Sequence, residues 1–158
     1  MDQITDKIWL GNASVARNIS LLKRNGITKV LSIMNNPPHT YKESDGINLK
    51  YINIYDKPGE NIIRHFGDCI KFMEGNEKVL VHCIFGKSRS ATIVIAYLIW
   101  KKKISLEEVL NFVKQKREMA VPNIGFKKQL QIFEELLKAN KYNLNKIDFK
   151  NIEWDYKS

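Results

Sequence analysis

The stretch that decides the fold reads HCIFGKSRS and occupies residues 82–90. It follows an apolar run at 79–81, typical of a short buried β-strand, and precedes an apolar run at 91–100, typical of a buried helix. A loop that passes from a strand into a helix gathers backbone N–H groups at the helix N-terminus, where an anion binds readily. The pattern therefore predicts an anion site in an α/β protein.

Two side chains in this stretch carry reactive groups, Cys83 and Arg89. Arg89 offers a planar, two-pronged guanidinium that suits phosphate. The helix dipole, the loop amides and Arg89 all favour the thiolate form of Cys83. A thiolate that faces a bound phosphate is a nucleophile that faces an electrophile, so the stretch predicts phosphatase chemistry. Sulfur transfer of the rhodanese type is the main alternative for this spacing.

The length of 158 residues indicates one domain with its own core. We expect no membrane anchor, because no apolar run approaches the ~20 residues that span a bilayer. We expect no signal peptide either, because Met1-Asp2 begins none. Cys69 and Cys83 are the two cysteines, and we expect no disulfide, with Cys69 as an inert core thiol. Free thiols favour a reducing compartment, the cytoplasm or the nucleus.

The net charge of +9 raises the question of a nucleic-acid partner. The lysines are scattered, however, and the cluster at 101–103 closes a predicted helix, where cations complement the helix dipole. We therefore expect no nucleic-acid partner. We interpret the net positive charge as a feature that keeps the protein soluble and attracts polyanionic substrates.

Predicted strands and helices alternate along the chain. The strands are expected as a short pair within 4–10, at 28–34, at 50–55 as a second central strand, and at 79–81. The helices are expected at 18–25, 62–73, 91–100, 105–117 and 125–137, with loops at 35–39 and 56–61. This order predicts an α/β fold with a central mixed sheet flanked by helices. Ligands in such folds bind at the carboxyl ends of strands, where Cys83 lies.

Several segments outside the loop carry a family resemblance. They read IWLGN at 8–12, GITKVL at 26–31, RSAT at 89–92 and PNIGF at 122–126, with Arg117 before the last. In this order, over roughly residues 3–138, they resemble the dual-specificity phosphatases, the compact branch of the cysteine-based protein tyrosine phosphatase superfamily. The resemblance implies a compact catalytic domain at 1–138 and a C-terminal tail at 139–158, whose aromatic residues we expect to dock on the domain surface. A partner-binding tail is the alternative.

The resemblance also assigns roles to residues. Cys83 would attack phosphorus and form a phosphocysteine, and Ser90 would donate a hydrogen bond to the sulfur. The substrate's phosphate would be bound by the loop residues Ile84, Phe85, Gly86, Lys87, Ser88 and Arg89. His82 would help to hold the thiolate, and Asn123 would buttress the loop. We expect no metal and no other cofactor, because the two-step cysteine reaction needs none.

A proton donor for the leaving oxygen is also required, and a carboxylic acid on a loop beside the pocket is the expected type. Asp56 fits, since it lies at the end of a predicted strand in a loop with Pro58 and Gly59, although Asp is also common in ordinary turns. Glu60 is the fallback acid.

The sequence departs from the family pattern at two loop positions. Phe85 stands where a small residue is usual, so it either reshapes the pocket or packs under the loop, and Lys87 adds positive charge. The sequence therefore predicts a phosphatase of phosphotyrosine and phosphoserine or phosphothreonine in proteins, with phosphoproteins as its partners. The alternatives are a phosphoinositide or an RNA 5′-phosphate as substrate, or a phosphate-binding pseudoenzyme.

Overall fold

The sheet has five strands, in a computed structural model that describes residues 1–36 and 39–156. The strands are β1 (Asp2–Gln3), β2 (Ile8–Gly11), β3 (Ile27–Ile33), β4 (Asn48–Ile52) and β5 (Lys78–His82), in the spatial order β1-β2-β5-β3-β4. β1 runs antiparallel to β2, and the other neighbours are parallel. The predicted mixed sheet is therefore confirmed.

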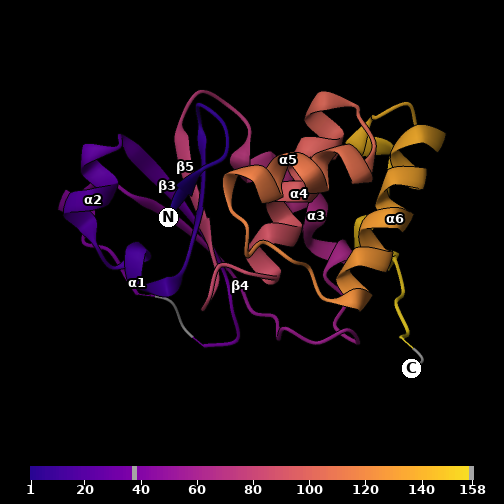
Figure 1. The fold of residues 1–158 in the computed structure, drawn as a ribbon, viewed down its shortest axis with the longest axis horizontal. Helices are drawn as coiled ribbons and strands as arrows, with labels where there is room; N and C mark the ends of the chain where they lie inside the picture. The colour runs from indigo at the N-terminus through magenta and orange to yellow at the C-terminus, as the bar shows by residue number, and fades with distance from the viewer. Residues whose placement is uncertain (37–38, 157–158) are drawn as a thin grey trace.

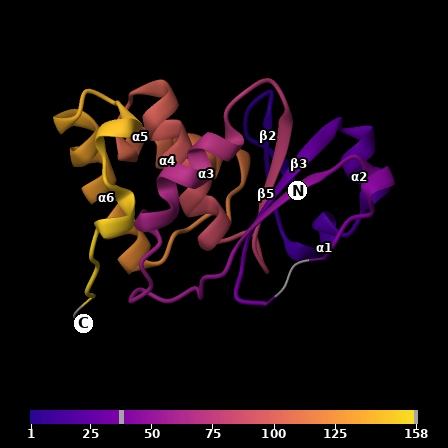
Figure 2. The same cartoon turned by 180° about the vertical axis from the view of Figure 1, so that it is seen from behind.

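Helices cover both faces of this sheet. They are α1 (Ala13–Ala16), α2 (Ile19–Arg24), α3 (Phe66–Met73), α4 (Arg89–Lys102), α5 (Leu106–Lys116) and α6 (Ile124–Ala139). The 3-10 helices are η1 (Glu43–Asp45), η2 (Ile63–His65), η3 (Leu144–Lys146) and η4 (Phe149–Asn151). Figures 1 and 2 show α1 and α2 on one side of the sheet and α3 to α6 on the other. Within the described ranges, none of the helices has the length and apolar character needed to span a bilayer.

The central element of the larger core is α4. It packs against β5, β2 and β3 on one side and against α3, α5 and α6 on the others, so every residue from Arg89 to Ile99 is buried. A helix enclosed on all sides needs no polar face, which explains the continuous apolar run in its sequence. A smaller core, which includes Trp9 and Leu22, lies on the α1–α2 side of the sheet.

Side-chain caps fix the predicted helix starts. Asn18 accepts from the N–H of Leu21 at 3.1 Å, and Ser105 accepts from the N–H of Glu108 at 3.2 Å. Each cap satisfies a donor that has no partner inside its helix. The predicted helices agree with the observed ones to within a few residues, except that the sequence did not predict α1.

The prediction of a second central strand at 50–55 is wrong in its placement. β4 pairs with β3 alone and forms the edge of the sheet, while the central strand β5 lies between β2 and β3. Alternation of polar and apolar residues reports which face is buried but not which strand is the neighbour. Of the predicted loop at 35–39, Pro37 and Pro38 lie outside the described residues.

The C-terminal segment docks on the domain through its aromatic residues, as predicted. The ring of Phe149 lies 5.9 Å from that of Phe133 on α6. It also covers Gly67 so closely that a Cβ there would lie 2.6 Å from the Phe149 ring, so this contact requires glycine. Farther along, the indole N–H of Trp154 donates to the Pro58 carbonyl at 2.8 Å.

Candidate active site

The carboxyl ends of three parallel strands meet at one edge of the sheet. Gly11 of β2 and Ser32 of β3 both lie opposite His82, the last residue of β5. The segment 83–89, which we call the anion loop, leaves the sheet at this point and enters α4 at Arg89 (Figure 1). The structure therefore places Cys83 where the sequence predicts it.

The carbonyl oxygens in the middle of the anion loop, at residues 84–88, accept hydrogen bonds from groups outside the loop. The donors are the backbone N–H groups of Ala13, Val121 and Thr92 and the guanidinium of Arg117. In a planar trans peptide the C=O and the next N–H point in opposite directions. The N–H groups of residues 85–89 therefore face the interior of the loop, which makes a concave anion-binding surface.

Arg117 has a role in the site that the sequence analysis missed. Its Nε donates to the Gly86 carbonyl at 2.9 Å and its Nη2 to the Phe85 carbonyl at 3.2 Å, while its Nη1 pairs with Asp2 at 2.8 Å. Gly86 has φ of 66°, and a Cβ there would lie 2.5 Å from the Gly11 oxygen. The loop conformation thus requires glycine at this position. The only sequence signal for Arg117 was its place beside the PNIGF segment.

The sulfur of Cys83 lies inside the loop, with the residue only 2% exposed. The Gly86 N–H donates to it at 3.2 Å, and the Ser90 hydroxyl lies 3.1 Å from it. Donors aimed at a sulfur stabilise its ionised form. The arrangement provides a nucleophile at the base of an anion site, with Ser90 in the predicted position.

Arg89 is buried and held along one edge of its guanidinium. Its Nη1 donates to Asn35 Oδ1 at 2.9 Å and to the Ile54 carbonyl at 3.0 Å. Its Nε is buried and, within the described part of the chain, has no hydrogen-bond partner. A buried donor without a partner costs about 1–3 kcal/mol, and an oxyanion in the loop would satisfy it. Asn35, which the sequence analysis also missed, orients the guanidinium.

Asn123 connects the predicted acid to the anion loop. Its backbone N–H donates to Ser88 Oγ at 2.9 Å, and its side-chain Nδ2 donates to Asp56 Oδ1 at 2.9 Å. The Asp56 side chain is otherwise exposed. The carboxylate of Glu60 accepts from the Tyr55 N–H at 3.0 Å, so it is engaged within its own loop. The geometry favours Asp56 over Glu60 as the acid.

His82 contacts the loop backbone. One ring nitrogen forms a hydrogen bond with Ser32 Oγ, and the other lies 3.1 Å from the Cys83 carbonyl oxygen. Burial lowers the pKa of His82, so the neutral ring is favoured. This environment suits a residue that orients Cys83 through its carbonyl.

The two unusual loop residues point outward. Phe85 is 69% exposed, so the suggestion that it packs under the loop is wrong. Arg117, which is buried and bonded to the Phe85 and Gly86 carbonyls, lies there instead. Lys87 is also exposed. Both side chains are therefore available at the rim of the site.

Known proteins share this arrangement of elements. Residues 8–136 match the family described as "Dual specificity phosphatase, catalytic domain". Dual specificity protein phosphatase 1 of Arabidopsis thaliana is 36% identical over 143 residues, which cover 87% of this chain and 70% of the relative. Dual specificity protein phosphatase 22 of Mus musculus is 37% identical over 139 residues, or 85% and 74% of the two chains. The crystal structure of human DUSP28 gives a TM-score of 0.84 at 30% identity and covers 89% of this chain and 99% of that one.

Proposed function

The chain belongs to the dual-specificity phosphatase family and is a protein phosphatase, and we propose that it hydrolyses its phosphate esters in two steps, through a phosphorylated Cys83. The observation that carries this proposal is the buried Nε of Arg89, which has no partner among the described residues and borders a loop whose N–H groups face inward. A phosphoryl group bound inside the anion loop would have its phosphorus atom facing the Cys83 sulfur. Such preorganised donors stabilise the charge that develops on the phosphoryl oxygens.

In the first step the Cys83 thiolate attacks phosphorus. The S–P bond forms as the P–O ester bond breaks, while Arg89 and the N–H groups of 85–89 hold the equatorial oxygens. Asp56 gives its proton to the leaving oxygen, which departs as an alcohol or phenol. Its hydrogen bond from Asn123 orients the carboxyl group towards the loop.

In the second step water attacks the phosphocysteine. The Asp56 carboxylate takes a proton from the water as the new P–O bond forms and the S–P bond breaks. The Ser90 hydroxyl, 3.1 Å from the sulfur, donates to the departing thiolate. Inorganic phosphate then leaves, and the enzyme regains both of its starting protonation states.

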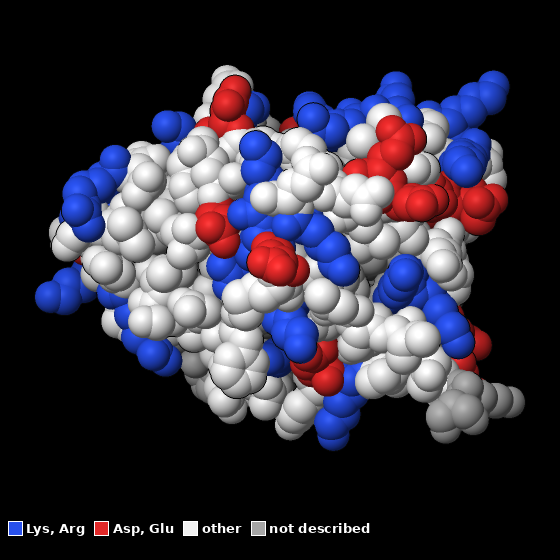
Figure 3. All heavy atoms as spheres, in the orientation of Figure 1, with Lys and Arg blue, Asp and Glu red and all other residues white. Residues whose placement is uncertain are grey.

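The same evidence bears on substrates and location. The matching relatives are protein phosphatases, so phosphoinositide and RNA 5′-phosphate substrates are not favoured. On the face shown in Figure 3, the basic side chains lie in separate groups with acidic ones beside several of them, which supports our proposal that no nucleic acid is bound. We assign the catalytic domain to 1–138 and the tail to 139–158. The need for a reduced Cys83 supports a cytoplasmic or nuclear location.

Replacing Asp56 with alanine is expected to make the rate depend steeply on the leaving group. The kcat for phenyl phosphate should fall about 10²- to 10⁴-fold, because phenolate then leaves without a proton. The kcat for dinitrophenyl phosphate, whose leaving group needs no proton, should fall far less. Steady-state kinetics with both esters measures the difference.

The matched control is Glu60→Gln, whose amide oxygen can still accept from the Tyr55 N–H. This variant should keep the wild-type ratio of the two rates. Equal losses for both esters in Asp56→Ala, or a steep leaving-group dependence in Glu60→Gln, would show that Asp56 is not the acid.

A further inference from the structure

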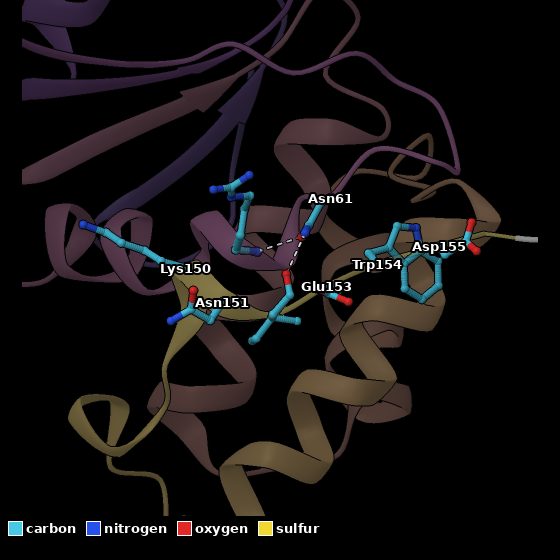
Figure 4. Close-up of a pocket in the computed structure, with 8 residues that line it drawn as sticks. Asn61, Lys150, Asn151, Glu153, Trp154 and Asp155 are labelled. Carbon is cyan, nitrogen blue, oxygen red and sulfur yellow. Dashed lines mark hydrogen bonds between the residues drawn. The ribbon is translucent and has the colours of Figure 1, made fainter.

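A polar cavity lies between the tail and the segment that carries the predicted acid. Its volume is about 460 Å³, and it is lined on one side by Asn61 and Arg64 and on the other by residues 150–155. Figure 4 shows Asn61 opposite the tail residues, with dashed lines from its side chain to the tail and to the backbone of η2. The cavity marks the place where residues 150–155 of the tail meet the segment that follows Asp56.

Two hydrogen bonds join the tail to the acid loop, which we define as residues 56–61. The indole Nε1 of Trp154 donates to the Pro58 carbonyl at 2.8 Å. The side-chain Nδ2 of Asn61 donates to the Ile152 carbonyl at 2.8 Å. In each bond the donor and the acceptor residue are more than ninety positions apart in sequence, so these bonds form only when the tail is docked.

The acid loop also rests on α6, next to the bond from Trp154. A Cβ at Gly125 would lie 2.1 Å from the Pro58 oxygen, so the backbone of the loop is in direct contact with this helix. Gln129 donates to the Glu60 carbonyl at 2.9 Å. The acid loop is therefore held by both the start of α6 and the tail.

Asp56 itself is held weakly by comparison. It lies at the start of the loop, its side chain is exposed, and it accepts one hydrogen bond from Asn123. A general acid must lie within hydrogen-bond reach of the leaving oxygen. A misplacement of about 1 Å in a reacting group can cost about 100-fold in rate. The position of the loop backbone therefore controls the proton transfer.

We propose that Trp154 is a positioning residue for the general acid, and that the tail acts through it as a strap that fixes the acid loop. This inference rests on the proposed role of Asp56. The strap lies outside the family match, which ends at residue 136. The contact of Trp154 is chemically specific, because indole carries one N–H donor and that group donates to the Pro58 carbonyl.

The test is Trp154→Phe in the full chain, which keeps an aromatic ring and removes the donor. The matched control is Trp100→Phe, because the Trp100 indole N–H donates to the Tyr142 carbonyl at 3.1 Å and so also joins a tryptophan to the tail, away from the acid loop. Steady-state kinetics with phenyl phosphate and dinitrophenyl phosphate, and the combination of each variant with Asp56→Ala, give the readout.

Trp154→Phe is expected to lower kcat for phenyl phosphate about tenfold, below the ~100-fold of a 1 Å misplacement, with KM and the dinitrophenyl phosphate rate unchanged. In the Asp56→Ala background it should have no further effect, because the two residues act on one step. Trp100→Phe should leave the ratio of the two rates as in the wild type.

Three results would overturn the proposed strap. Trp154→Phe could lower kcat equally for both esters, or lower it further in the Asp56→Ala background. The ratio of the two rates could also be the same in Trp154→Phe and Trp100→Phe. If Asp56→Ala behaves as predicted and Trp154→Phe does not, only this inference fails. If Asp56→Ala shows no leaving-group dependence, Asp56 is not the acid, and this inference fails together with the proposed role of Asp56, whereas the role of Cys83 is tested separately.

Discussion

Replacing Cys83 with serine is expected to abolish turnover while the protein stays folded. The kcat should fall by more than about 10⁴-fold, as when other enzymes lose their nucleophile. The physical reason lies in what surrounds the sulfur: the Gly86 N–H donates to it, and the Ser90 hydroxyl lies within hydrogen-bond distance of it. A serine hydroxyl in their place must first lose its proton, and these partners supply no base to accept it.

The measurement is kcat for an aryl phosphate, together with the thermal midpoint of unfolding and the binding of inorganic phosphate. Cys69→Ala is the control, since Cys69 is fully buried on α3, outside the anion loop. The control should lose stability rather than kcat per folded molecule. A Cys83→Ser protein with kcat within tenfold of the wild type would rule out the cysteine mechanism.

Replacing Arg89 with lysine is expected to lower kcat/KM by about 10² to 10³-fold, the range seen when one preorganised donor to a developing oxyanion is lost. Lysine keeps the charge but not the planar fork. It cannot keep the Nη1 bonds to Asn35 and the Ile54 carbonyl and at the same time offer a second nitrogen to phosphate. The predicted loss therefore comes from geometry rather than from charge.

Arg64→Lys is the matched control, because Arg64 is an exposed arginine that lines the polar cavity and lies outside the anion loop. Its kcat/KM should stay close to the wild-type value. Inorganic phosphate should also bind more weakly to Arg89→Lys than to Arg64→Lys. If Arg89→Lys is as active as this control, the planar guanidinium of Arg89 is not needed to bind the phosphoryl group.

The placement of Cys83, Arg89 and Ser90 could be predicted because they are close in sequence. Cys83, Arg89 and Ser90 all belong to one continuous strand, loop and helix, whose geometry follows from the local chain. Helix starts could be predicted for the same reason, since Asn18 and Ser105 each cap a residue three positions away. Local chain order was enough for these features.

The features that could not be predicted depend on residues far apart in sequence. Asn35 reaches Arg89 across 54 positions, and Arg117 reaches the Gly86 carbonyl across 31. The edge position of β4 is set by its pairing with β3, which no alternation pattern encodes. The bond from Trp154 to Pro58 likewise needs the complete fold.

The central claim, that the loop holds a phosphoryl group against the reactive sulfur of Cys83, is tested most directly by cysteine alkylation with iodoacetamide, with and without inorganic phosphate. Iodoacetamide should modify Cys83, and inorganic phosphate should slow this modification because it occupies the anion loop in front of the sulfur. Cys69 should stay unmodified, because burial raises its pKa to about 12. A rate of Cys83 modification that inorganic phosphate leaves unchanged would contradict the claim.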